Sequence, residues 1–267
     1  MHNRGKKSIL GVLVDALDYE AATEFVLRAA RERRGAAISA LAVHGVMAGV
    51  LDKEHKFRLN HFDLLAPDGQ PVRWGLNLLY RAGLSDRVYG PNLTLRVCER
   101  ACLEKIPVYF YGSTPEILKS LRETLAIRFP GIQMAGMEPS RFRCLTCEEK
   151  RQLADRIAAS GAKILFVGLG CPRQEVFAFE FRNVLRLPIM AVGAAFPFLA
   201  GRIAQAPLWM QRAGLEWLFR LACEPRRLWR RYVFLNPAYA FLLLAQALRI
   251  LRFNEEGTSP HREILFG

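Results

Sequence analysis

The stretch AKILFVGLGCPRQE, residues 162–175, is the clearest guide to the fold. It begins with a short continuous run of apolar residues, which is the pattern of a strand covered on both faces of a sheet. Two glycines and a proline interrupt that run, and an amphipathic helical pattern follows over residues 173–184. Strand, glycine-containing turn and helix in this order predict one repeating unit of a parallel α/β sheet.

The same order recurs along most of the chain. Strands are expected at residues 8–14, 36–43, 62–66, 107–112, 131–136, 162–168 and 188–193, and helices at 19–33, 71–82, 92–104, 114–128, 147–159 and 173–184. Buried strands that alternate with helices predict the α/β class, with a mostly parallel sheet flanked by helices. Ligands of such sheets bind beyond the carboxyl ends of the strands, so the residues that follow each strand are the candidates for function.

The last part of the chain differs in composition from the rest. The whole chain has a net charge of +13, and residues 202–252 contain nine arginines, no lysine and two acids. A basic balance favours anionic partners, and arginine in particular suits forked bonds to phosphate. We expect three parts: an α/β core at 1–200, a basic helical appendage at 201–253 and a flexible tail at 254–267.

The residues after Pro225 separate into two faces when they are placed on a helix at about 100° per residue. One face holds only guanidinium groups, and the other holds only apolar and aromatic groups. The two sets are Arg226, Arg227, Arg230 and Arg231, and Leu228, Trp229, Tyr232 and Val233. One interpretation is that the guanidinium face binds phosphates, while the apolar face lies against the core or a bilayer surface. The alternative is an ordinary solvated face, although such faces usually mix acids with arginines.

We expect neither a secretion signal nor a membrane-spanning segment. Asp15 and Asp18 interrupt the first apolar run, and the longest apolar run, at 237–248, is shorter than the roughly 20 residues that span a bilayer. The six cysteines are scattered, and the CxxC of Cys144 and Cys147 lacks the second pair that a zinc site would need. These features indicate a reducing, cytoplasmic compartment.

Three common nucleotide-binding motifs are missing or incomplete. GLGCPR at 168–173 has arginine where a dinucleotide fingerprint has its third glycine, and there is no GxxxxGK[ST] loop. An Asp-x-Asp pair that could hold a metal-bound diphosphate is also missing. The sequence therefore predicts no cofactor and no metal, and it leaves arginines to bind a diphosphate.

Several motifs together resemble the WecG/TagA/CpsF family of bacterial glycosyltransferases. They are PDG at 67–69, RVYGPNL at 87–93, VYFYGSTPEIL at 108–118, FVGLGCPRQE at 166–175, VGAAFPFLAG at 192–201 and QAPLWMQRAGLEWLFRLACEPRRLWRRY at 205–232. The resemblance runs in order from about residue 9 to about residue 240. It implies a Rossmann-like parallel core and a C-terminal appendage that helps to close the active site and meets the membrane.

The resemblance also implies a reaction. Family members pass an N-acetylmannosamine-type sugar from UDP to a polyprenyl-diphosphate-linked acceptor, which implies exopolysaccharide or other surface-glycan synthesis at the inner face of the plasma membrane. Asp68 matches the proposed catalytic base, and Gly69 of the same motif is a candidate for substrate binding. The substrate-binding positions are matched by Arg87, Gln174, Arg220, Arg227 and Arg230.

Asp68 fits the role of base on chemical grounds as well. Glycosyl transfer from a nucleotide diphosphate needs a base for the acceptor hydroxyl and positive charge for the leaving diphosphate. A carboxylate in a Pro-Asp-Gly turn at a strand end suits the first task, and one base with direct displacement predicts inversion at the sugar carbon. The alternative is that Asp68 is only a turn residue, because Asp-Gly is ordinary turn chemistry.

Two departures from the family pattern bear on this function. The Thr and Asn that usually follow the second strand are replaced by Ala40 and Ala42, and His44 is a candidate for part of their role. Pro197 replaces an acid that the family places near the nucleotide. These losses motivate a second hypothesis, an inactive homologue that still binds a nucleotide sugar or a lipid diphosphate.

The high charge motivates a third hypothesis, a basic nucleic-acid-binding protein. The resemblance argues against it and gives a different set of partners. These are a UDP-sugar donor, a polyprenyl-diphosphate-linked acceptor and the membrane surface, with no nucleic acid. The oligomeric state is left open, and a homo-oligomer is one alternative.

Overall fold

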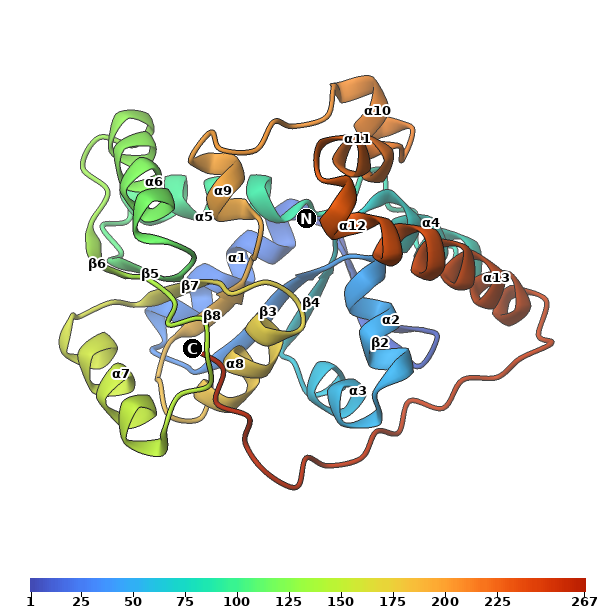
Figure 1. Ribbon diagram of the computed structural model, residues 1–267, viewed down its shortest axis with the longest axis horizontal. Coiled ribbons are helices and arrows are strands. Elements are labelled where there is room, and N and C mark those ends of the chain that lie inside the picture. The colour runs from blue at the N-terminus through green and yellow to red at the C-terminus, as the bar shows by residue number, and fades with distance from the viewer.

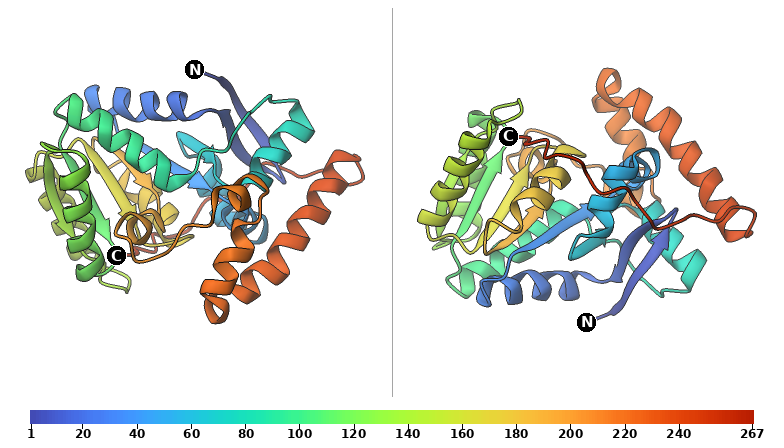
Figure 2. Two further views of the ribbon diagram at one scale, coloured as in Figure 1. Left: turned by 90° about the horizontal axis from the view of Figure 1, so that it is seen from above. Right: turned by 90° about the horizontal axis from the view of Figure 1, so that it is seen from below.

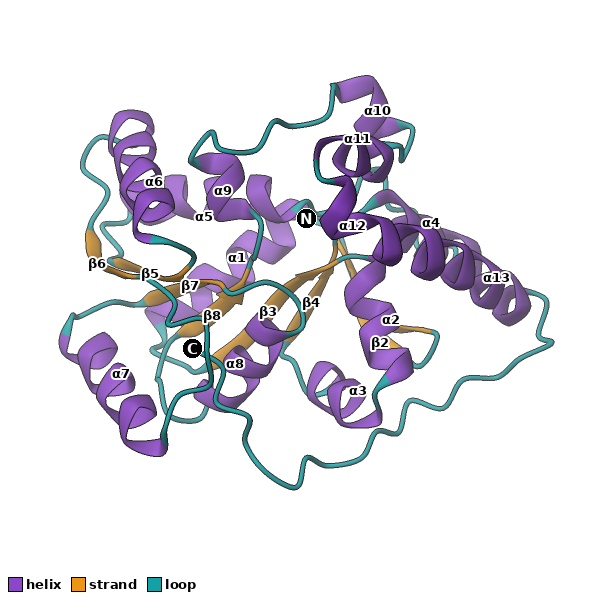
Figure 3. Ribbon diagram, viewed as in Figure 1, coloured by secondary structure: helices purple, strands orange, loops and turns teal.

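A parallel sheet of six strands forms the centre of the protein. The computed structural model describes residues 1–267 apart from the side chain of Arg231. Its strands are β3 (Ala36–Leu41), β4 (Leu64–Pro67), β5 (Val108–Gly112), β6 (Met134–Glu138), β7 (Ile164–Gly168) and β8 (Pro188–Ala191). They lie in the order β4–β3–β8–β7–β5–β6, and each neighbouring pair is parallel (Figure 3). The predicted α/β class with a Rossmann-like parallel sheet is confirmed.

The N-terminal segment is a hairpin and not the single strand predicted at 8–14. β1 (Asn3–Ile9) and β2 (Val12–Leu17) pair antiparallel. Leu10 and Gly11 turn the chain with φ values of 53° and 84°, and a tight type I′ turn requires two positive values. The prediction was wrong because the apolar run continues through the turn, which only Gly11 marks. Asp15 in β2 accepts a hydrogen bond of 2.8 Å from the Leu65 N–H, and this bond attaches the hairpin to β4.

Helices cover both faces of the sheet (Figures 1 and 2). One face packs against α1 (Tyr19–Arg31), α5 (Gly90–Leu103), α6 (Pro115–Arg128) and α9 (Ala195–Leu199). The other packs against α2 (Val43–Leu51), α3 (Lys53–Asn60), α4 (Gln70–Tyr80), α7 (Cys147–Ala159), α8 (Arg173–Phe181) and the hairpin. The sequence predicted neither α2 nor α3, which are short and meet at Asp52, the N-cap of α3.

The chain after the sheet forms α10 (Leu208–Arg212), α11 (Glu216–Cys223), α12 (Pro225–Arg230), the π-helical turn η1 (Arg231–Leu235) and α13 (Asn236–Ala247). These elements run along one side of the molecule, orange to red in Figure 1. α13 packs beside α2 and α4, where the hydroxyl of Tyr239 donates a hydrogen bond of 3.1 Å to the carbonyl of Pro71. Tyr239 is buried in the same apolar layer as α2 and α4, so the last helix of the predicted appendage is packed on the core.

The segment 254–267, for which the sequence predicts a flexible tail, runs back across the molecule from α13 (Figure 2). The Thr258 N–H donates to the carbonyl of Lys53 at 3.0 Å. Further along, the buried carboxylate of Glu180 in α8 accepts the N–H groups of Ile264 and Leu265 at 2.7 and 3.0 Å. The segment therefore contacts α3 and α8 in the structure.

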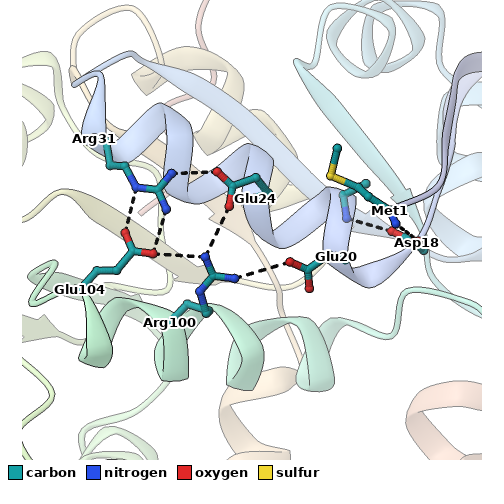
Figure 4. Close-up of polar contacts among 8 residues, drawn as sticks. Met1, Asp18, Glu20, Glu24, Arg31, Arg100 and Glu104 are labelled. Carbon is teal, nitrogen blue, oxygen red and sulfur yellow. Dashed lines mark hydrogen bonds and ion pairs between the residues drawn. The ribbon is translucent and has the colours of Figure 1, made fainter.

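Ion pairs join α1 to α5 on the outer surface of the molecule (Figure 4). Arg31 pairs with Glu24 and Glu104 at 2.8 Å, and Arg100 lies 3.3 Å from Glu104 and 3.5 Å from Glu24. Such partly exposed pairs contribute at most about 1 kcal/mol each, so they align the two helices more than they stabilise the fold. The alignment matters for the site because the hydroxyl of Tyr19 in α1 accepts the N–H of Tyr89, directly before α5.

Candidate active site

A cavity of about 110 Å³ lies beyond the carboxyl ends of β3 and β4. The turns after these two strands form one side, and α11, η1 and α13 form the other. Its lining residues are Ala42, Val43, His44, Asp68, Gly69, Gln70, Pro71, Arg87, Tyr89, Gly214, Glu216, Trp217, Arg220, Tyr232 and Asn236. This is the edge at which parallel α/β sheets bind their ligands.

The backbone fixes Asp68 at the floor of this cavity. β4 ends at Pro67, and the N–H of Asp68 donates to the carbonyl of Leu41 in β3 at 3.1 Å. Gly69 follows with φ of 87°, a conformation that L-residues rarely adopt, and α4 then begins at Gln70. The Asp68 carboxylate accepts a hydrogen bond from the N–H of Gly90 at the start of α5. Asp68 is thus a turn residue whose side chain is aimed into a cavity.

The surroundings of Asp68 raise the pKa of its carboxyl above the ordinary value. Burial is the largest cause, and it raises the pKa of the carboxyl from 3.8 to about 7 against the opposing effect of Arg87. The Glu216 carboxylate adds to the rise, whereas the Gly90 N–H and Arg220 lower the pKa. A carboxylate that titrates near neutrality is matched to proton abstraction at that pH.

Arg87 is a buried cation beside Asp68. Its guanidinium lies 2.5 Å from the carboxylate of Glu216, 3.2 Å from the amide oxygen of Gln211 and 4.3 Å from the centre of the Tyr89 ring. The neighbouring Val88 N–H donates to the carbonyl of Pro67 at 2.9 Å, so the segment that carries Arg87 is tied to the Asp68 turn.

Arg220 brings a second positive charge to the cavity from α11. Its guanidinium lies 5.5 Å from the centre of the Phe198 ring and 4.0 Å from the Glu224 carboxylate. Its Nε atom is buried and has no hydrogen-bond partner among the residues that the structure describes. Two guanidinium groups that line the same cavity as Asp68 form an arrangement that can bind a diphosphate.

The structure brings together five of the eight residues singled out in the sequence. His44, Asp68, Gly69, Arg87 and Arg220 all line the cavity. The other three do not belong to its lining, and their substrate-binding roles remain predictions.

Gln174 lies at the start of α8, beside the ends of β7 and β8. Its amide donates to Glu175 at 2.9 Å and accepts the N–H of Gly170 at 3.1 Å. A Cβ on Gly193 would lie only 2.7 Å from the same amide oxygen, so this side chain is tightly enclosed. Gln174 therefore holds the GLGCPR turn in place, whatever else it binds.

Arg227 and Arg230 lie on the exposed side of α12. Arg227 pairs with Glu224 at 2.7 Å, and Arg230 lies 5.3 Å from the centre of the Trp229 ring. Of the opposite face, Leu228 and Tyr232 are buried, whereas Trp229 and Val233 are 44% and 52% exposed. The apolar face is thus divided between the core and the surface. The side chain of Arg231, which the sequence placed on the guanidinium face, lies outside the described residues.

Four further cavity residues were not predicted from the sequence: Tyr89, Glu216, Trp217 and Asn236. A signal for Glu216 was present, because it is one of two acids among nine arginines in residues 202–252. The aromatic residues carried no such signal, since aromatic residues at helical spacing are usually part of a core.

The two departures from the family pattern have different positions. Ala42 lines the cavity and is the N-cap of α2, where its side chain makes no capping bond. Pro197 lies in α9 and does not line the cavity, and its carbonyl accepts the N–H groups of Arg202 and Ile203. The Ala42 departure thus removes a polar group from the cavity itself.

The described residues contain no cluster of three or more His, Cys, Asp or Glu side chains arranged to hold a metal ion. Likewise, none of the helices in the described part of the chain has the length and apolarity needed to cross a bilayer.

Comparison with known proteins gives one family. The model of the "Glycosyl transferase WecG/TagA/CpsF family" matches residues 7–252. Two similar proteins are both named N-acetylglucosaminyldiphosphoundecaprenol N-acetyl-beta-D-mannosaminyltransferase. The one from Bacillus spizizenii is 32% identical over 76% of this chain and 74% of its own. The one from Bacillus subtilis is 26% identical over 80% of this chain and 81% of its own.

Proposed function

The chain belongs to the WecG/TagA/CpsF family of glycosyltransferases, and on that premise we propose that it transfers an N-acetylmannosamine-type sugar from UDP to a polyprenyl-diphosphate-linked saccharide. The relatives' names supply the sugar and the lipid-linked acceptor. The observation that carries the proposal is the cavity itself, whose lining combines a carboxyl with a pKa of about 7, the buried guanidinium of Arg87 and the partly exposed guanidinium of Arg220.

The proposed reaction is a direct displacement without a metal ion. Asp68 takes the proton of the acceptor hydroxyl as that oxygen forms a bond to the sugar C1, and the bond from C1 to the UDP oxygen breaks with its electron pair. Arg87 and Arg220 stabilise the charge that develops on the leaving diphosphate. Of the two carboxylates that line the cavity, Glu216 is engaged by Arg87, which leaves Asp68 as the base. One displacement inverts the configuration at C1.

We also propose that the C-terminal helices rest on the inner face of the plasma membrane. Six large apolar side chains of this region are 61–71% exposed: Leu208, Trp209, Phe234, Phe241, Leu248 and Ile250. Exposed arginines of α12 lie in the same region, and basic residues beside apolar ones suit an anionic leaflet. Attachment there would bring the cavity close to a lipid-linked acceptor.

Vesicle co-sedimentation tests the membrane proposal. The double variant Phe241→Ser, Ile250→Ser should bind anionic vesicles more weakly than the wild type. The control Ile127→Ser, in which an 82% exposed residue of α6 is replaced, should bind like the wild type. Equal binding by all three proteins would contradict the proposed surface.

The transfer reaction is tested with a panel of UDP-sugars and a short-chain polyprenyl-diphosphate-GlcNAc acceptor in the presence of EDTA. We expect UDP-N-acetylmannosamine to be used and the product anomer, read by NMR, to be opposite to that of the donor. A retained anomer would contradict direct displacement, and activity that EDTA abolishes would contradict metal independence. If UDP binds but no donor reacts, the inactive homologue becomes the better account, with Ala42 as its first explanation.

A further inference from the structure

Glu216 is a charged side chain of the cavity to which the proposed reaction gives no role. It lies in the first turn of α11, and its side chain is 13% exposed. Its carboxylate is 2.5 Å from the Arg87 guanidinium and hydrogen-bonds to Tyr89. The C-terminal helices are thereby joined to the segment before α5, which itself is bonded to the Asp68 turn.

The ion pair lies on the same helix as Arg220, one turn before it. Residues four apart lie on the same face of a helix, so fixing Glu216 against Arg87 turns Arg220 toward the same cavity. Breaking a buried pair by removing one partner leaves an uncompensated charge, which is strongly unfavourable. The position of α11 therefore depends on the Glu216 carboxylate and not only on apolar packing.

The Arg87–Glu216 pair also affects the electrostatic environment of the Asp68 carboxyl. Asp68 and Glu216 both interact with the Arg87 guanidinium, so the positive charge of Arg87 acts on two carboxylates. Without Glu216, Arg87 would act on Asp68 with no second carboxylate beside it. The charged and titratable groups that line the cavity or act on Asp68 are Arg87, Tyr89, Glu216, Arg220, His44, Tyr232 and Tyr19.

We propose that Glu216 is a positioning residue that clamps α11 to Arg87, places Arg220 beside Asp68 and keeps Arg87 from neutralising the base. The inference rests on the proposed function for its kinetic consequence, although its structural consequence can be measured without turnover. Glu216 does not touch the reacting atoms. It acts through Arg87 and Arg220.

The test compares Glu216→Gln with the control Glu54→Gln. Glu54 pairs at 3.2 Å with Arg58, another buried arginine, but in α3 and away from the cavity, so the control reports the general effect of removing such a carboxylate. The first measurement is the pKa of Asp68, read by carbon NMR in protein with labelled aspartate and assigned with Asp68→Asn. It is lowered by about one unit or more in Glu216→Gln, because a nearby like charge has gone, and it is unchanged in Glu54→Gln. An unchanged value in Glu216→Gln overturns the proposal.

The second measurement is the pH profile of kcat/KM. In Glu216→Gln the acidic limb moves to lower pH by the same amount as the NMR value, and kcat falls at least about 10-fold at pH 8 because Arg220 is no longer held in place. A limb that stays at its wild-type position contradicts the proposal. A wild type without turnover would instead reject the proposed function, and the NMR result would still decide the role of Glu216.

Glu216→Asp covers the case in which the glutamine variant does not fold. It keeps the charge on a side chain shorter by one methylene. We expect the pKa of Asp68 to stay close to the wild-type value and kcat to fall, because α11 must shift to keep the pair. Full wild-type kcat in this variant would overturn the clamp.

Discussion

Replacing Asp68 by asparagine should stabilise the folded protein at alkaline pH, because wild-type folding works against the ionisation of this carboxyl. The pKa is about 7 in the folded state and near 3.8 in the unfolded chain. Below pH 3.8 both states hold the proton, and the carboxyl does not affect stability. As the pH rises from 3.8 to 7, the unfolded chain loses its proton first, so the wild type loses stability that the asparagine variant keeps.

The size of the effect follows from the same two values. A difference of about three pH units corresponds to about 4 kcal/mol. The expected gain is about 2–4 kcal/mol at pH 8, since Asp68 is partly exposed and solvent weakens the effect. At pH 4.5 the gain should be at most about 1 kcal/mol. Urea unfolding followed by tryptophan fluorescence at the two pH values measures it. If wild type and variant change in parallel between pH 4.5 and 8, Asp68 does not have a raised pKa, and the argument for it as a base near neutrality fails.

Two further predictions concern the arginines and the sheet. Arg220→Ala should lower kcat by about 10²–10³-fold in the transfer assay, because a donor that stabilises the leaving diphosphate is lost. Arg227→Ala should lower kcat less, because this side chain is 62% exposed. Equal losses of kcat in the two variants would contradict the different roles given to the two arginines. Gly112→Ala should lower the melting temperature more than Gly131→Ala, because both residues have positive φ but only at Gly112 would a Cβ lie 2.8 Å from the backbone of Gly168. Equal shifts of the melting temperature in the two variants would show that the positive φ, and not the close contact at Gly112, determines the loss of stability.

The sheet was predictable from the sequence because its strands are apolar on both faces and end at glycine or proline. Six of the seven expected strands belong to the parallel sheet. The seventh was misread because the hairpin turn at Leu10 and Gly11 lies inside an apolar run. α2 and α3 were missed because each is too short to show several helical periods, and their only clear boundary signal is Asp52.

The sequence predicted the site best where a candidate functional residue is also a typical turn residue. Asp68 and Gly69 stand at a strand end, and the resemblance added Arg87 and Arg220, which the fold brings to the same cavity. Glu216 was not found, since its importance depends on a contact with a residue 129 positions earlier in the chain. No periodicity or local motif reports such a pairing, which arises only when α11 packs over the carboxyl ends of β3 and β4.

The central claim is that Asp68 is the base of a sugar transfer in this cavity. Turnover of wild type and Asp68→Asn at pH 8, with the donor and acceptor that the wild type uses and with UDP binding measured in parallel by calorimetry, tests it most directly. We expect the variant to bind UDP with little change and to lose about 10²–10⁴-fold in kcat. A variant that binds UDP normally and turns over at nearly the wild-type rate would contradict the claim.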